Sequence, residues 1–188
     1  MGRRLLIVGP PGAGKGTQAA MIARALGIPH VSTGEMLRGQ VARGTDLGKR
    51  AKVIMDTGEL VPDEIVIAMV KERLAEGDAA CGFLLDGFPR TAAQAEALDR
   101  EVADRPLEMV LSLEVGEEEV VRRLLKRAEI EGRSDDTEET VRNRMAVYRA
   151  QTEPLIAYYR SKGTLRPLDG MGTIAEIFSR IAAALAAA

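Results

Sequence analysis

The chain has 188 residues and a formal net charge of −2 at pH 7, from 26 lysines and arginines and 28 aspartates and glutamates. This length suits one α/β domain with a sizeable core and small inserted segments. The near-neutral charge gives no general electrostatic reason to bind nucleic acid or a membrane surface. The low aromatic content, 3% with no tryptophan, argues against platforms that stack single-stranded bases.

Cysteine use and hydropathy narrow the class further. A single cysteine, Cys81, excludes an intrachain disulfide and a cysteine-rich zinc site. No apolar run approaches the roughly 18 residues of a membrane span, and no signal-peptide pattern precedes the first apolar run. We therefore expect a cytosolic enzyme with no structural zinc, no membrane partner and no nucleic-acid partner.

The first motif along the chain reads Gly-Pro-Pro-Gly-Ala-Gly-Lys-Gly-Thr, over residues 9–17. It follows the apolar run Leu5–Val8 and precedes a helical pattern over Gln18–Leu26, which is the layout of a phosphate-binding loop. Glycines let the backbone curl so that its N–H groups form an anion nest at a helix N-terminus. Lys15 would add a mobile positive charge, and the Thr17 hydroxyl could serve Mg²⁺. The loop predicts a nucleoside triphosphate site, although an extra glycine separates the lysine from the threonine.

Short apolar runs alternate with helical patterns along the rest of the chain. The expected strands are Arg3–Val8, His30–Ser32, Gly82–Leu85, Met109–Leu113 and Thr164–Leu168. The alternation predicts a three-layer α/β P-loop fold, with a five-stranded, mainly parallel sheet that carries helices on both faces. Ligands of such sheets bind beyond the carboxyl ends of the strands. We expect the residues that follow the first three strands to converge there on one crevice.

Two stretches look like excursions from this core. The first, residues 32–61, has helical patterns broken by Gly39, Gly44, Gly48 and Gly58. The second, residues 127–137, is charged and nearly devoid of core residues. Both suit mobile flaps, while ordinary solvated helices and a surface loop are the alternative.

Arginines are dense between residues 122 and 149, where seven occur. Arginine is suited to bidentate capture of phosphate oxygens. We expect four of them to be surface charges paired with glutamates across helical turns, namely Arg122, Arg123, Arg142 and Arg149. Arg127 and Arg133 flank the charged loop, and Arg144 lies 11 residues beyond Arg133. Eleven residues are about three helical turns, so a folded-back loop could bring the heads of Arg133 and Arg144 together.

The single histidine, His30, stands at the start of an expected strand, where a structural role is expected. Phosphoryl transfer to another phosphate needs no histidine base, because the attacking phosphate is already anionic and catalysis reduces to positioning and charge neutralisation. Asp86 follows the apolar run Phe83–Leu85 and is placed like the acidic residue that orients Mg²⁺ in P-loop enzymes. A plain turn aspartate before Gly87 is the alternative.

Six motifs occur in order along the chain: GPPGAGKGT from Gly9, VSTGEMLR from Val31, GELVPDEIV from Gly58, LLDGFPRTAAQ from Leu84, LLKRAEIEGRSDDTEETVRNRM from Leu124, and Pro154–Tyr159. Together they resemble the adenylate kinase family, whose loop has the same extra glycine. Five residues separate Arg127 from Arg133, and zinc-binding cysteines are missing. The resemblance is therefore to the type with a short lid rather than a long one.

The resemblance implies reversible, Mg²⁺-dependent transfer of the terminal phosphoryl group of ATP to AMP, which gives ADP from both and maintains adenine nucleotide balance. It implies a single kinase domain with its core over residues 1–31, 62–126 and 138–188, an AMP-binding flap over 32–61 and a short lid over 127–137. Short-lid relatives are generally monomers, so a cytoplasmic monomer is expected.

The same resemblance assigns residue roles at the matching positions. ATP would be bound by Gly12, Ala13, Gly14, Lys15, Gly16, Thr17, Arg127 and Gly172. AMP would be bound by Thr33, Arg38, Glu59, Leu60, Val61, Gly87, Phe88, Pro89, Arg90, Gln94, Arg133 and Arg144. Catalysis would rest on Lys15, Arg90, Arg127, Arg133 and Arg144. Mg²⁺ would be organised by Thr17 and, through water, by Asp86.

The UMP/CMP kinases resemble the chain in fold, loop and arginines, and they are the alternative. They typically carry alanine where Thr33 stands and asparagine where Gln94 stands. A glutamine amide can pair bidentately with the 6-amino group and N7 of adenine, which favours AMP as the acceptor. A nucleotide-dependent switch is disfavoured, because the sequence has no Asn-Lys-x-Asp motif to read guanine.

Overall fold

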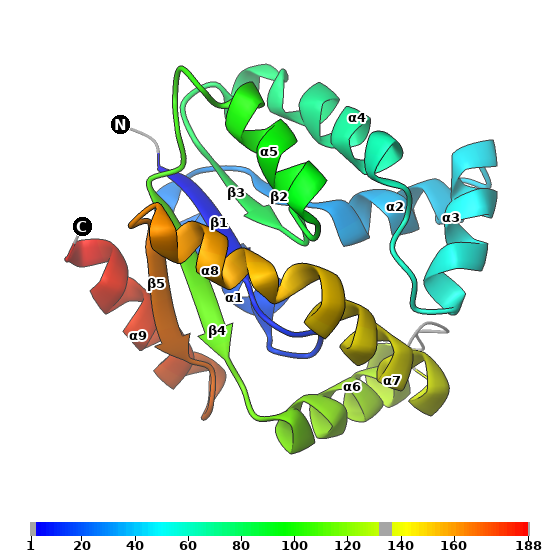
Figure 1. The fold of residues 1–188 in the computed structure, drawn as a ribbon. Helices are drawn as coiled ribbons and strands as arrows, with labels where there is room; N and C mark the ends of the chain where they lie inside the picture. Colours follow the sequence, from blue (N-terminus) through cyan, green and yellow to red (C-terminus); the bar gives the residue numbers. More distant parts are fainter. Residues whose placement is uncertain (1–2, 132–136, 188) are drawn as a thin grey trace.

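The computed structural model describes residues 3–131 and 137–187. A parallel sheet of five strands lies at the centre, in the order β2-β3-β1-β4-β5 (Figure 1). The strands are β1 (Arg4–Val8), β2 (His30–Ser32), β3 (Phe83–Asp86), β4 (Met109–Glu114) and β5 (Leu165–Asp169). The predicted α/β fold is confirmed, and each predicted strand is present with its ends shifted by at most one residue.

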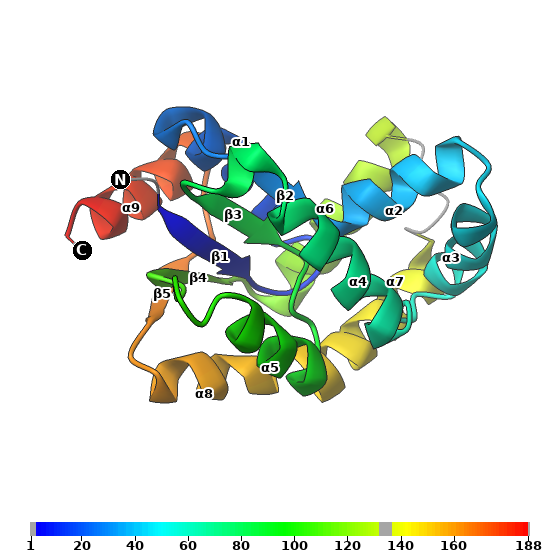
Figure 2. The ribbon, with the colours of Figure 1, turned by 90° about the horizontal axis from the view of Figure 1, so that it is seen from above.

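Helices cover both faces of this sheet, as Figure 2 shows from above. One face carries α1 (Lys15–Leu26) and α9 (Ile174–Ala186). The other carries α4 (Asp63–Leu74), α5 (Ala92–Glu101) and α8 (Pro154–Ser161). A short 3₁₀ turn, η1 (Gly77–Ala79), links α4 to β3.

The two-sided core explains the apolar strands. Successive side chains of a strand point to opposite faces, and β1 shows this directly. Leu5 and Ile7 pack in the cluster with α1 and α9, whereas Leu6 and Val8 pack in the cluster with α4, α5 and α8. Because both faces are covered, every residue of the strand centre is apolar rather than alternating with polar residues.

Four helices extend from this core on the side of the strands' carboxyl ends (Figure 1). The flap segment (residues 32–61) forms α2 (Thr33–Ala42) and α3 (Asp46–Asp56). Farther along, α6 (Glu117–Glu131) packs on α7 (Glu138–Val147), which continues through the π-helical turn η2 (Tyr148–Thr152) into α8. Arg127 therefore lies on a helix and not at the edge of a loop, which corrects that part of the sequence interpretation.

The prediction that four glycines break the flap helices is wrong at two positions. Gly44 and Gly58 do end helical segments, with φ of +65° and +81°. Gly39 lies inside α2 and Gly48 inside α3. Gly48 is needed for a different reason, since an added Cβ would overlap the carbonyl group of Gln40. It lets the two flap helices approach closely rather than breaking either one.

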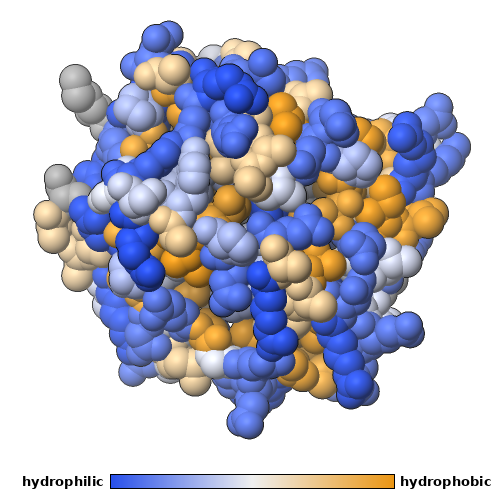
Figure 3. All heavy atoms as spheres, in the orientation of Figure 1, coloured by the Kyte–Doolittle hydropathy of each residue, from blue (hydrophilic) through white to orange (hydrophobic). Residues whose placement is uncertain are grey.

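The surface is mostly hydrophilic on the face seen in Figure 3, with hydrophobic residues gathered toward the side that bears α3. Val53 on α3 contributes to the exposed apolar surface of the molecule, because 69% of it is accessible to solvent. In the described part of the chain, no helix combines the length and apolar character of a membrane span.

Candidate active site

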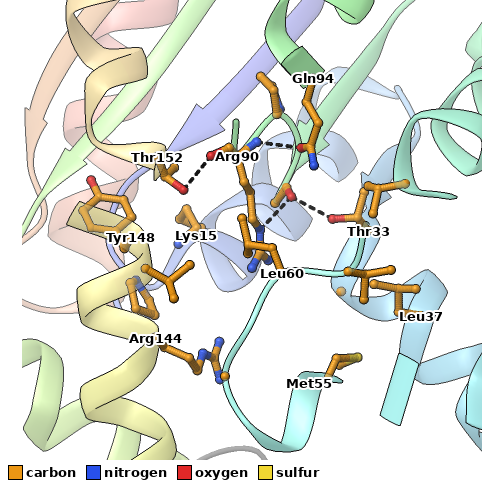
Figure 4. Close-up of a pocket in the computed structure, with 18 of the residues that line it drawn as sticks. Lys15, Thr33, Leu37, Met55, Leu60, Arg90, Gln94, Arg144, Tyr148 and Thr152 are labelled. Atoms are coloured by element: carbon orange, nitrogen blue, oxygen red, sulfur yellow. Dashed lines mark hydrogen bonds between the residues drawn. The ribbon is translucent and has the colours of Figure 1, made fainter. Parts of the chain in front are cut away.

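A cleft opens at the carboxyl ends of β1, β2 and β3, between the flap segment and α7 (Figure 4). The space inside it, counted out to open solvent, is about 1050 Å³. Three groups of residues line it: Gly9, Pro11 and Lys15 from the loop after β1; Thr33, Arg38 and Glu59–Val61 from the flap; and Gly87, Pro89, Arg90, Gln94 and Arg144 from the opposite wall. The predicted convergence of the first three strand ends is confirmed.

The loop after β1 has the backbone of an anion nest. Gly12 and Gly14 have φ of +80° and +87°, in the left-handed region that favours glycine. A Cβ added at Gly12 would also lie 2.8 Å from a Leu124 side-chain atom. Gly14 caps α1 without a side-chain hydrogen bond, so the first-turn N–H groups of α1 can face a bound anion.

Lys15 folds back onto this loop. Its Nζ donates to the carbonyl oxygens of Gly9 and Pro10, both at 2.8 Å. These hydrogen bonds satisfy the ammonium while no phosphate is present. They also hold its charge at the mouth of the nest, where a phosphate group could take their place.

Several charges converge on Lys15. Burial lowers the pKa of Lys15 to about 7, with the attraction of Asp86 acting against this shift and the nearby charges of Arg90, Arg144 and Arg127 contributing to it. The charges of three arginines from distant parts of the chain therefore act on one ammonium group, and two of them, Arg90 and Arg144, line the same cleft as Lys15. Such a concentration of positive charge is unfavourable by itself and becomes favourable when phosphate groups enter.

Asp86 ends β3 and is buried, with 8% of the residue exposed. His30 Nε2 lies 3.3 Å from Asp86 Oδ2, within hydrogen-bonding distance. Burial opposes ionisation, but the hydrogen bond from His30 and the charge of Lys15 together lower the pKa of Asp86 below its usual range. A Cβ added at Gly16 would lie 3.5 Å from Asp86 Oδ2, so this carboxylate faces the phosphate-binding loop.

Arg90 is held in place through its backbone and its side chain, as the dashed lines of Figure 4 show. Its Nε and the Oγ1 of Thr33 both donate to the Gly87 carbonyl oxygen at 2.8 Å. Thr152 Oγ1 donates to the Arg90 carbonyl oxygen at 2.9 Å, and the Arg90 N–H donates to Gln94 Oε1 at 2.8 Å. The flap, α5 and η2 thus meet at this one arginine.

Several predicted residues do not line the cleft: Ala13 is buried in the loop, and Thr17 lies exposed in the first turn of α1. Phe88 is 2% exposed, and its side chain packs in the core instead of lining the cleft. Arg127 projects from α6, and Gly172 lies in the loop before α9 with φ of +106°. Arg133 lies outside the described residues.

The predicted pairing across helical turns is confirmed for Arg122, Arg123 and Arg142, whereas Arg149 pairs with a glutamate of another helix, α6. Arg122 and Arg123 contact Glu119, Arg142 contacts Glu138, and Arg149 contacts Glu117. Arg123 also donates to the carbonyl oxygens of Ala13 at 3.4 Å and Gly170 at 3.0 Å. It therefore joins α6 to both the phosphate-binding loop and the loop that contains Gly172. Sequence spacing could not separate Arg123 from its neighbour, because both sit one helical turn from the same glutamate.

Comparison with known proteins identifies the family. The adenylate kinase family model matches residues 7–164. The chain belongs to the adenylate kinase family. It is 57% identical over 184 residues to an adenylate kinase of Thermobifida fusca, covering 97% of each chain. It is 55% identical over 188 residues to one of Thermus thermophilus, covering 98% of each. It is 50% identical over 186 residues to one of Stenotrophomonas maltophilia, covering 98% of this chain and all of the relative.

Membership of the adenylate kinase family makes the chain a nucleoside monophosphate kinase, a phosphotransferase that binds adenine nucleotides. The alternative assignment as a UMP/CMP kinase finds no support among these relatives.

Proposed function

We propose that AMP binds in the cleft beneath the flap, that ATP lies along the phosphate-binding loop, and that the enzyme transfers the terminal phosphoryl group between them. The observation that carries this proposal is that Lys15, Arg90 and Arg144 line one cleft, while the charge of Arg127 on α6 also acts on Lys15. Four such cations suit two phosphate chains that face one another. They do not suit an uncharged acceptor, which would leave their mutual repulsion uncompensated.

The residues of this site act by positioning and by charge neutralisation. Lys15 exchanges the carbonyl oxygens of Gly9 and Pro10 for phosphate oxygens. Arg90, which Gly87 and Thr152 fix in place, holds the AMP phosphate. Arg127 and Arg144 neutralise the charge on the phosphoryl group in transit, and Arg133 is assigned the same role from the sequence alone.

Mg²⁺ fits the oxygen donors next to the loop. The Thr17 hydroxyl and the Asp86 carboxylate are hard ligands of the kind that Mg²⁺ accepts together with water and phosphates. Bound there, the ion would neutralise part of the triphosphate charge. His30 Nε2, 3.3 Å from Asp86 Oδ2, would help to hold the carboxylate in place for Mg²⁺ at the loop.

Closure of the flap (residues 32–61) and of the lid (residues 127–137) would exclude water, which would otherwise accept the phosphoryl group. We propose that the enzyme works as a cytoplasmic monomer without a nucleic-acid or membrane partner. The modest net charge of −2 supports the lack of a nucleic-acid partner.

A coupled assay for ADP formation tests the proposal. The purified chain should produce ADP rapidly from ATP and AMP with Mg²⁺, slowly with CMP or UMP as acceptor, and hardly at all from ATP alone. EDTA should abolish the activity. Equal rates with and without AMP would contradict the assignment and indicate an ATPase instead.

A further inference from the structure

Asp63, the first residue of α4, connects the flap side of the cleft to α5. Its Oδ1 accepts a hydrogen bond from Gln94 Nε2 at 2.7 Å, and its Oδ2 accepts one from Thr91 Oγ1 at 2.9 Å. Thr91 caps α5, because its hydroxyl also accepts from the Gln94 N–H at 3.2 Å. Neither the family resemblance nor the sequence pattern assigns Asp63 a role in the reaction.

The hydrogen bonds of the Gln94 amide can be counted completely. A glutamine amide offers two donors on Nε2 and two lone pairs on Oε1. Asp63 uses one donor, and the Arg90 N–H uses one lone pair at 2.8 Å. Gln94 is only 2% exposed, yet it lines the cleft. One donor and one acceptor therefore remain for a ligand in the cleft.

The two partners also fix which way the amide faces. If the amide rotated by half a turn, Nε2 would face the Arg90 N–H, donor against donor. Oε1 would then face the Asp63 carboxylate, acceptor against acceptor. Gln94 is buried and both contacts are at least partly buried, so each mismatch would cost a hydrogen bond and leave a polar group of the amide unsatisfied. Asp63 and the Arg90 backbone together hold a single orientation.

A fixed orientation distinguishes purine bases. Adenine presents an amino donor at position 6 beside a ring acceptor, which matches one acceptor and one donor on Gln94. A 6-oxopurine presents an acceptor at position 6, and on its Watson–Crick edge it would need the amide reversed. An amide that was free to rotate would accept either base.

We propose that Asp63 is a positioning residue that locks the Gln94 amide and so sets the preference for a 6-aminopurine over a 6-oxopurine acceptor. The proposal rests on the proposed function, with the base of AMP placed against Gln94 as predicted from the sequence. A purely structural role, in which Asp63 only ties α4 to α5, is the competing explanation.

The test compares AMP with inosine 5′-monophosphate as acceptor in Asp63→Ala, Asp63→Asn and wild-type enzyme. In Asp63→Ala we expect KM for AMP to rise on the order of tenfold with a small change in kcat. We expect the kcat/KM preference for AMP over inosine monophosphate to fall by a similar factor. Asp63→Asn can still offer an oxygen to Gln94 Nε2 and should restore the preference to within about threefold.

Lys71→Met is the matched control, because Lys71 Nζ and Glu101 Oε2, 3.1 Å apart, also tie α4 to α5 away from the cleft. Its acceptor preference should equal that of wild type. If Asp63→Ala folds poorly, Asp63→Leu, which fills the space without an acceptor, serves in its place. Thermal unfolding of every variant shows which one is folded.

The outcomes separate this inference from the proposed function. If wild type prefers AMP and Gln94→Ala loses that preference, while folded Asp63→Ala or Asp63→Leu keeps it, the positioning role is overturned and the proposed function stands. If Gln94→Ala also keeps the preference, the base does not contact Gln94 and both are overturned. A loss of preference in Lys71→Met as well would assign the effect to the tie between the helices.

Discussion

Lys15 Nζ and the carbonyl oxygen of Pro10 lie 2.8 Å apart, so the phosphate-binding loop accepts a hydrogen bond from its own lysine. The arrangement has an energetic cost. Burial and the surrounding arginines lower the pKa of Lys15 from its ordinary 10.5 to about 7. The ligand-free protein is therefore less stable than it would be with a neutral side chain at this position, and the ligand removes the cost.

Lys15→Met should raise the free energy of unfolding of the ligand-free protein by on the order of 2 kcal/mol near pH 6, while it abolishes turnover. The lost ammonium repulsion and desolvation outweigh the two hydrogen bonds to the loop that disappear. Chemical denaturation in EDTA, without nucleotide, measures the change. If Lys15→Met were less stable than wild type at pH 6, the claim that the buried Lys15 charge destabilises the protein would be contradicted.

The pH dependence follows from the same shift. Below pH 7 the folded wild type carries the buried charge and its full cost. Between about pH 7 and 10.5 the folded state has released the proton and the unfolded chain has not, so this contribution makes stability rise with pH. The advantage of Lys15→Met over wild type should therefore shrink as the pH increases through that window. If the difference in free energy of unfolding between Lys15→Met and wild type stayed constant over this pH range, the lowered pKa of Lys15 would be contradicted.

Arg144→Ala should lower kcat by roughly 10³- to 10⁵-fold, the range for a guanidinium group that neutralises a transferring phosphoryl group. Its melting temperature should change little, because the residue lines the cleft and is not part of the core. Arg142→Ala is the matched control on the same helix, since Arg142 points to solvent and pairs with Glu138 at 2.6 Å. Equal activity of the two variants would remove Arg144 from the mechanism.

Much of the fold could be predicted because it depends on local patterns. Apolar runs bounded by glycine and helical spacing give the strands of a covered parallel sheet to within one residue. The phosphate-binding loop was equally clear, because its glycines and lysine act within nine adjacent residues. A binding site formed by adjacent residues can be predicted from the sequence without knowledge of tertiary contacts.

The parts that sequence reasoning missed depend on contacts between distant segments. Gly48 looks like a helix breaker until the neighbouring helix is placed against it. Arg123 has the spacing of a surface ion pair but also reaches the Gly170 carbonyl oxygen, 47 positions away. Asp63 precedes Gln94 by 31 positions, and no local pattern pairs them. Each of these roles is set by packing, which periodicity does not encode.

Thr33→Ala should raise KM for AMP on the order of tenfold with a small effect on KM for ATP. The Thr33 hydroxyl donates its hydrogen to the Gly87 carbonyl oxygen at 2.8 Å. Its lone pairs can then accept a hydrogen bond from a donor on the AMP base. Because UMP/CMP kinases typically carry alanine there, the preference for AMP over CMP should also fall. Thr57→Ala is the control in the same flap, where the hydroxyl bonds only the Ile54 carbonyl oxygen among the described contacts. Steady-state kinetics with AMP and with CMP as acceptor measure these changes. If KM for ATP and KM for AMP rose equally, Thr33 would not be an AMP-binding residue.

Asn143→Ala should loosen the flap, because α7 holds the end of α3 through this side chain. Asn143 Nδ2 donates to the Thr57 carbonyl oxygen at 2.7 Å and to Glu59 Oε1 at 3.0 Å. Thr140, one turn earlier on the same face, donates to the Asp56 carbonyl oxygen at 2.9 Å. Losing one such contact should speed amide hydrogen exchange over residues 57–60 by roughly an order of magnitude and raise KM for AMP several-fold.

The sites of the change distinguish this loosening from general destabilisation. Exchange in β1 and β4 should stay as in wild type, because those strands form the central core, away from the contact between α7 and the flap. Arg142→Ala, next to Asn143 but turned to solvent, should leave both exchange and KM unaltered. Since closure of the flap excludes water from the phosphoryl group, Asn143→Ala should also increase the slow release of phosphate from ATP. Unchanged exchange at the end of α3 would show that the flap is held by its own packing and not by α7.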